Sequence, residues 1–159
     1  ARIARLGMHF IGAGIAQTTQ VYDEALRRHG RDPADFQVAQ NRFVHVAPTR
    51  DQAWDEVQEH LHYMLSWYNR WLSEARNSST GHGGIPPMPS PAELRHLDAE
   101  MLGGPIIGSP EEVTRTLIGI KSEMRMTQLI ATMDYAGMDA QVMRRSMELF
   151  AREVMPALH

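Results

Sequence analysis

Residues 103–158 read GGPIIGSPEEVTRTLIGIKSEMRMTQLIATMDYAGMDAQVMRRSMELFAREVMPAL, and this stretch decides the fold class. Residues 109–112, SPEE, form a capping box with proline at the first helical position, which predicts a helix that begins there. The nearly all-apolar run 127–133 predicts a parallel strand buried on both faces. Residues 142–155 predict a closing helix. Helix, strand and helix in this order are typical of an α/β fold with parallel strands.

The same alternation of helices and strands extends toward the N-terminus. Residues 8–11 predict a short strand, and residues 16–29 predict a helix that ends at a glycine. Residues 36–47 predict a longer strand, with polar residues on both faces. Its faces carry Val38, Gln40, Arg42, Val44 and Val46 on one side and Ala39, Asn41, Phe43 and His45 on the other. Apolar residues at three- and four-residue spacing predict a long helix over 49–75.

The composition limits the classes of protein to which the chain can belong. Its 159 residues are enough for one domain, residues 1–159, with a core, whereas a complete (β/α)8 barrel takes about 250 residues. The net charge of −3 and the absence of a basic block predict no nucleic-acid partner and no membrane partner. The absence of cysteine excludes disulfides and cysteine nucleophiles, and it fits a cytoplasmic protein.

Residues 77–104 predict an irregular insertion, because Ser, Gly and Pro are frequent in their first half. A short helix is expected within them, near residues 92–101. One interpretation of the insertion is a lid over a site, since long irregular loops in compact domains are often functional. The other interpretation is a surface loop.

Five segments of the chain, taken in order, resemble the second half of the luciferase-like, flavin-dependent monooxygenases. They are ARLGMHF (4–10), EALRRHGRDPADFQV (24–38), FVHVAPTRDQAWDEV (43–57), IIGSPEEVTRTL (106–117) and SMELFAREVMPAL (146–158). The resemblance covers nearly the whole chain. It implies the C-terminal portion of a (β/α)8 TIM barrel, with about three parallel strands and flanking helices, and nothing that corresponds to the first five strands.

The resemblance also implies a function. Members of this family use reduced FMN and oxygen on a small organic substrate, and one branch uses a deazaflavin instead, as a reductase. The flavin supplies the chemistry, while the protein orients the reactants and excludes water. A third hypothesis is a non-catalytic barrel fragment that folds by self-association, because strands taken from a closed barrel expose edges and apolar surface. The expected partners are a small-molecule substrate and either a second copy of the chain or the missing N-terminal half.

Active sites on this fold lie at the carboxyl ends of the strands, which indicates the candidate site residues. His9 and His45 are the catalytic candidates, as general acids or hydrogen-bond donors, although a strand histidine is more often satisfied by backbone or water. The cofactor-binding candidates are Phe10, Gly12 and Asn41, and the substrate-binding candidates are Phe43, Asp134 and Tyr135.

Two further patterns narrow the chemistry. The Arg-x-His pair that contacts substrate in the alkanesulfonate branch falls on Asn41 and Phe43 in this chain, which argues against a sulfonate substrate. His60 and His62 are two positions apart on the long helix and point in different directions, so they cannot share a metal. No His-x-x-x-His set occurs, and we expect no metal site.

Overall fold

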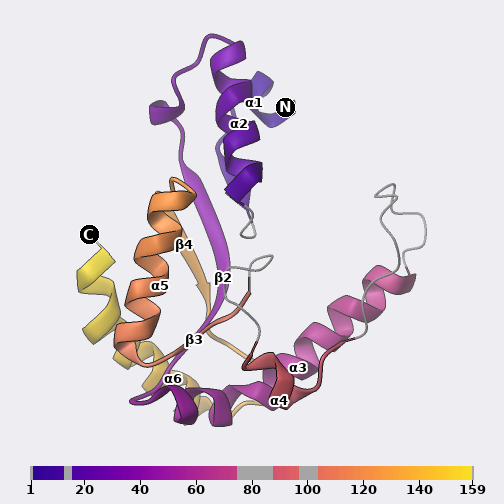
Figure 1. Ribbon diagram of the computed structural model, residues 1–159, viewed down its shortest axis with the longest axis vertical. Coiled ribbons are helices and arrows are strands. Elements are labelled where there is room, and N and C mark those ends of the chain that lie inside the picture. The colour runs from indigo at the N-terminus through magenta and orange to yellow at the C-terminus, as the bar shows by residue number, and fades with distance from the viewer. Residues whose placement is uncertain (1, 13–15, 75–87, 97–103, 159) are drawn as a thin grey trace.

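The computed structural model describes residues 2–12, 16–74, 88–96 and 104–158 of the chain (Figure 1). The helices are α1 (Arg2–Leu6), α2 (Ala16–Arg28), α3 (Arg50–Glu74), α4 (Pro91–Leu94), α5 (Pro110–Glu123) and α6 (Ala140–Leu149). The strands are β1 (Phe10–Gly12), β2 (Val38–Val46), β3 (Ile106–Gly108) and β4 (Gln128–Thr132). Short helical turns follow at η1 (Pro33–Asp35), η2 (Phe150–Val154) and η3 (Met155–Leu158). Most of the predicted insertion 77–104 lies outside the described residues, so the lid hypothesis stays a prediction.

β2 is the central strand, and it forms a parallel pair with each of the other three strands. Its first residues pair with β1, where Val38 lies beside Phe10. Its residues 39–43 pair with β4, and its end pairs with β3, where Val44 lies beside Ile106. Figure 1 shows α1 and α2 near the beginning of β2 and α3 near its end. The predicted α/β class with parallel strands is therefore confirmed.

Apolar side chains form three clusters along β2. The face that carries Val44 packs against α5 and against the C-terminal helical turns. At the beginning of the strand, Val38 packs against α1 and α2. At the carboxyl end, α3 and α4 cover Ile107 and Tyr135. The hydroxyl of Ser146 accepts a hydrogen bond from the backbone N–H of Val46 at 2.8 Å, which attaches α6 to the end of β2.

The helix boundaries follow the signals in the sequence. Ser109 and Glu112 form the predicted capping box, in which each side chain accepts a hydrogen bond from the other residue's backbone N–H. α6 begins at Ala140, two residues earlier than predicted, because the side chain of Asp139 accepts hydrogen bonds from the first free N–H groups of the helix. The observed ranges of α2, α3 and β2 agree with the predicted ranges to within two residues at each end.

Two strand predictions are wrong. The sequence predicts three strands, but Ile106–Gly108 form a fourth, because this three-residue segment is long enough to pair with the end of β2. β4 is not buried on both faces: Leu129 and Ala131 pack against the α5 cluster, whereas Ile130 on the other face is 43% exposed. An apolar run therefore predicts burial only where another element covers each face.

The second half of α3 projects away from the sheet, as Figure 1 shows. Trp54, in the first half, is buried in the cluster at the carboxyl end of β2. Trp71 falls on the same predicted apolar stripe but is 56% exposed, and it lies against Trp67 and Tyr68, which are also exposed. The apolar spacing of α3 therefore continues into a part of the helix that the core does not bury. Across the described ranges, the helices are too short or too polar to cross a lipid bilayer.

Replacing Leu117 with Ala tests the packing of α5 on the sheet. Leu117 is fully buried in the α5 cluster, so we expect its loss to lower the free energy of unfolding by about 2–5 kcal/mol. The neighbouring Ile118 is 47% exposed, and Ile118→Ala should change that free energy by less than about 0.5 kcal/mol. Denaturant unfolding of both variants measures the difference. Equal losses would contradict the described orientation of α5.

Candidate active site

One face of the sheet, here called the open face, has few covering side chains among the described residues. Parallel register places Ile11, Ala39 and Gln128 in one row across the sheet. The next rows pair Asn41 with Ile130 and Phe43 with Thr132. These seven residues define the open face. The Thr132 hydroxyl donates a hydrogen bond to the Asn41 side-chain oxygen at 3.0 Å, so these two side chains are held together.

The open face is mainly apolar and partly exposed. Ile11 is 68% exposed, Ile130 is 43% exposed, and Asn41 lies between them. Phe43 is half-buried and marks the boundary with the covered end of the sheet. Apolar side chains beside an amide and a hydroxyl suit a flat ligand that has an apolar ring and a polar edge.

His45 follows Phe43 on the same face of β2, but it is fully buried. Its Nε2 lies 2.9 Å from a carboxylate oxygen of Glu56, which is the contact of a hydrogen bond or an ion pair. Glu56 comes from the second turn of α3, which begins four residues after β2 ends. The turn between β2 and α3 therefore brings the carboxylate back over the strand from which it departs.

Tyr135, in the segment after β4, completes the group at the carboxyl end. Its ring meets the His45 ring edge to face at 6.0 Å between centroids, and the Phe43 ring at 6.2 Å. The Tyr135 hydroxyl and the His45 Nδ1 are both buried, and neither has a hydrogen-bond partner within the described part of the chain. Unpartnered buried polar atoms cost free energy, so two of them on rings that contact each other indicate a site built for more than packing.

Burial dominates the protonation of both groups. It lowers the pKa of His45, against the opposing effect of the Glu56 hydrogen bond and charge, and so keeps the imidazole neutral near pH 7. Burial, with a smaller contribution from Asp134, raises the pKa of Tyr135, so the phenol keeps its proton. When Glu56 accepts from Nε2–H, Nδ1 retains its lone pair. The group then presents an acceptor on His45 and a donor on Tyr135.

The three candidates near β1 lie elsewhere. His9 precedes β1, and its Nδ1 accepts a hydrogen bond from the Gln37 backbone N–H at 3.0 Å. It therefore lies at the amino end of β2, and the expectation that it lies at a carboxyl end is wrong because β1 begins at Phe10, two residues later than predicted. The Phe10 ring stacks on Tyr22 of α2 at 5.2 Å, away from the open face.

Gly12 also faces away from the open face. A side chain at this position would lie 2.8 Å from the Phe10 ring and 3.2 Å from the Gln40 amide nitrogen. Glycine is therefore needed here for packing on the α2 side of the sheet. Since Phe10 and Gly12 share that side, Ile11 is the residue of β1 whose side chain lies on the open face. The sequence analysis did not single it out.

The structure thus brings together four of the eight candidates: Asn41, Phe43, His45 and Tyr135. Asp134 is exposed beside them, just after β4. Sequence reasoning missed Glu56 and Thr132. An acidic residue in the second turn of the helix after a strand histidine is a usable signal for Glu56, whereas Thr132 becomes visible only through the register of β4. Within the residues described, no cluster of three or more His, Cys, Asp or Glu could hold a metal ion.

Comparison with known proteins identifies relatives of the chain. Residues 3–127 match the family model of the luciferase-like monooxygenases. The chain is 34% identical over 149 residues to the 4-hydroxyprotoasukamycin monooxygenase of Streptomyces nodosus subsp. asukaensis. That alignment covers 89% of this chain and 35% of the relative, so the chain spans about a third of the length of the curated relative it matches.

Solved structures with a similar fold include two monooxygenases and a reductase. Monooxygenase RslO1 from Streptomyces bottropensis matches with a TM-score of 0.70 at 15% identity, over 99% of this chain and 44% of that one. The oxygenating constituent of 3,6-diketocamphane monooxygenase from Pseudomonas putida, solved with FMN, matches with 0.68 at 19% identity, over 99% and 44%. The coenzyme F420-dependent tetrahydromethanopterin reductase from Methanopyrus kandleri matches with 0.56 at 15% identity, over 91% and 42%.

Replacing Glu56 with Gln tests the protonation of the buried histidine. Hydrogen bonding to Glu56 and its charge both raise the pKa of His45, so we expect the pKa to fall further in Glu56→Gln. A histidine whose pKa is lowered by folding stabilises the fold above its unfolded pKa of about 6.5, and that stability is lost as the pH falls through the folded pKa. The loss should therefore begin below about pH 6.5 and extend further in the variant.

The measurement is an NMR titration of the His45 imidazole, combined with unfolding at several pH values. Glu59→Gln is the matched control, because Glu59 is exposed on the same helix and is not a partner of His45 in the structure. A His45 pKa that is unchanged or higher in Glu56→Gln would show that the carboxylate does not act on this ring.

Proposed function

Because this chain belongs to the luciferase-like monooxygenase family, we propose that it forms part of a flavin-dependent oxidoreductase that uses reduced FMN and oxygen on a small organic substrate. The observation that carries the proposal is the open face, which ends at the buried His45 and Tyr135 group. The FMN complex of a structural relative supports FMN as the cofactor. The F420-dependent relative supports the alternative, a deazaflavin-dependent reductase.

We further propose that the four strands belong to a (β/α)8 barrel and that the open face lines its interior. The chain spans less than half of the solved relatives that it matches, which supports this arrangement. The exposure of Ile11 and Ile130 supports it as well, since a closed barrel covers the inward face of each strand. The remaining strands of the barrel are then the partner of this face.

The residues of the open face fit a flavin. Ile130 and Ile11 offer apolar surface to a flat ring, and the Asn41 amide, positioned by Thr132, offers hydrogen bonds to its polar edge. Phe43 closes the side nearest the buried group. A bound reduced flavin would supply the electrons and the site of oxygen activation, which no side chain can supply.

The buried group governs protons at the end of that face. The Tyr135 phenol stays protonated because burial raises its pKa, and burial keeps the His45 imidazole, whose ring it contacts, neutral. Glu56 fixes which imidazole nitrogen carries the proton. Since His45 is fully buried, its role in this proposal is to position the Tyr135 ring that it contacts, while Phe43 and Asp134 face the substrate.

Titration of the purified chain with FMN and with F420, oxidised and then reduced, tests the proposed function. We expect saturable binding of one of them, followed by flavin absorbance and fluorescence. Asn41→Ala should weaken that binding by up to about tenfold, because it removes the positioned amide. Gln141→Ala, an exposed change on α6, is the control and should bind as the original chain does.

Each outcome of this titration has a definite meaning. Tighter binding of FMN supports the monooxygenase, and tighter binding of F420 replaces it with the reductase. Failure of both flavins to bind would contradict the proposal that this chain carries part of a flavin site.

The mass of the chain in solution, measured by light scattering, tests whether two copies associate through the open face. Without the rest of a barrel we expect the chain to self-associate, because the open face exposes apolar side chains. A stable contact between two copies should bury roughly 1,000 Å2. Ile130→Lys should shift the chain toward the monomer. Ile118→Lys introduces the same charge at a similarly exposed position on α5 and should leave the mass unchanged. A monomer at all concentrations for the unsubstituted chain would contradict the expectation.

A further inference from the structure

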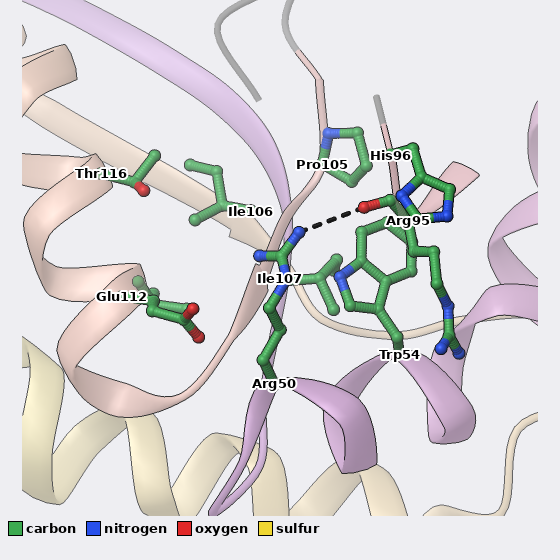
Figure 2. Close-up of a pocket in the computed structure, with 10 residues that line it drawn as sticks. Arg50, Trp54, Arg95, His96, Pro105, Ile106, Ile107, Glu112 and Thr116 are labelled. Atoms are coloured by element: carbon green, nitrogen blue, oxygen red, sulfur yellow. Dashed lines mark hydrogen bonds between the residues drawn. The ribbon is translucent and has the colours of Figure 1, made fainter. Parts of the chain in front are cut away.

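A cavity of about 470 Å3 lies between the beginning of α5, strand β3 and the beginning of α3 (Figure 2). Its walls include Arg50, Trp54, His96, Ile107 and Thr116. It shares no lining residue with the open face or with His45 and Tyr135. A volume of this size falls in the range of small-molecule sites.

Trp54 brings an unused hydrogen-bond donor to this cavity. Its side chain is 97% buried by the fold, and its indole N–H has no partner among the residues that the structure describes. Figure 2 shows the indole nitrogen on the edge of the ring that faces Arg50 and Ile107. A buried donor without an acceptor is unfavourable, and a ligand acceptor in the cavity would satisfy it.

Arg50 adds a positive charge with most of its donors unused. Its guanidinium donates a hydrogen bond to the Arg95 backbone carbonyl at 3.1 Å. Its guanidinium has no ion pair with a carboxylate among the described residues. The planar guanidinium has five N–H donors, and its fork matches the two oxygens of a carboxylate or a phosphate.

The other charged groups around the cavity are already occupied or lie at its rim. The Glu112 carboxylate accepts the Ser109 N–H at 3.0 Å as part of the helix cap. The Arg95 guanidinium turns away and pairs with Asp55 at 2.8 Å. His96 is exposed at the rim. Among the described residues, Arg95 therefore has a carboxylate partner, whereas Arg50 on the same walls has none.

We propose that this cavity binds the oxyanion group of a small molecule, a carboxylate or a phosphate, through the Arg50 guanidinium and the Trp54 indole N–H. The apolar side chains of Ile106, Ile107 and Val113 face the body of that molecule. Two donors from adjacent turns of α3 would then bind the same oxyanion group, which fixes the orientation of the ligand in the cavity.

An NMR titration of the full chain tests this proposal. The chain has three tryptophans and hence three indole N–H signals, of which Trp54→Phe identifies one. Inorganic phosphate and acetate are added separately, with sodium chloride adjusting the ionic strength. We expect the Trp54 signal to move to saturation with at least one probe at concentrations up to about 10 mM, while the Trp67 and Trp71 signals stay in place.

Variants at Arg50 separate specific binding from a general salt effect. Arg50→Gln should weaken binding about tenfold or more. Arg50→Lys should weaken binding less than Arg50→Gln, because lysine keeps the positive charge but lacks the forked donors of the guanidinium. Arg115→Gln removes the same charge from an exposed pair with Glu111 and should bind as the original chain does. Both Arg50 and Arg115 are exposed, so these variants should fold.

The results distinguish the source of the oxyanion and can overturn the site. Saturation by phosphate indicates a phosphorylated ligand, and saturation by acetate indicates a carboxylic acid. Equal movement of all three indole signals, no movement with either probe, or undiminished affinity in Arg50→Gln would each refute the site.

Discussion

The simultaneous pairing of β2 with three other strands is the constraint on which the rest of the structure depends. The nine residues of β2 pair along their length with β1, β3 and β4, so both edges of β2 are occupied. The same nine residues direct alternate side chains into the helix-covered face and the open face. The helices therefore take their places from the part of β2 against which they pack.

Burial along β2 changes from one end to the other, and the candidate site lies where it changes. Asn41 is exposed, Phe43 is half-buried, and His45 has no exposed surface. Because α3 crosses the carboxyl end of the sheet, the polar groups at that end lie in a low-dielectric interior while the residues before them face outward. A ligand on the open face would thus lie against buried, pKa-shifted groups without exposing them to bulk water.

The sequence predicts local structure well, but it predicts poorly which side chains are buried under other elements. Alternation assigned the two faces of β2 correctly, and capping residues located the beginning of α5, because both signals depend on near neighbours. The exposure of Ile130 and the burial of His45 depend on which distant element covers each position, and no local pattern carries that information. The orientation of Phe10 and Gly12 was missed for the same reason, since it follows from the packing of α2 on β1.

The contact between His45 and Glu56 has a consequence for how this protein can diverge. A change of Glu56 to an apolar residue leaves a buried imidazole with both ring nitrogens unsatisfied, whereas a change of both residues to apolar ones can restore a packed interior. The two positions should therefore vary together among homologous chains. A relative that keeps histidine in the strand and loses the acid from the helix should carry a replacement acceptor nearby.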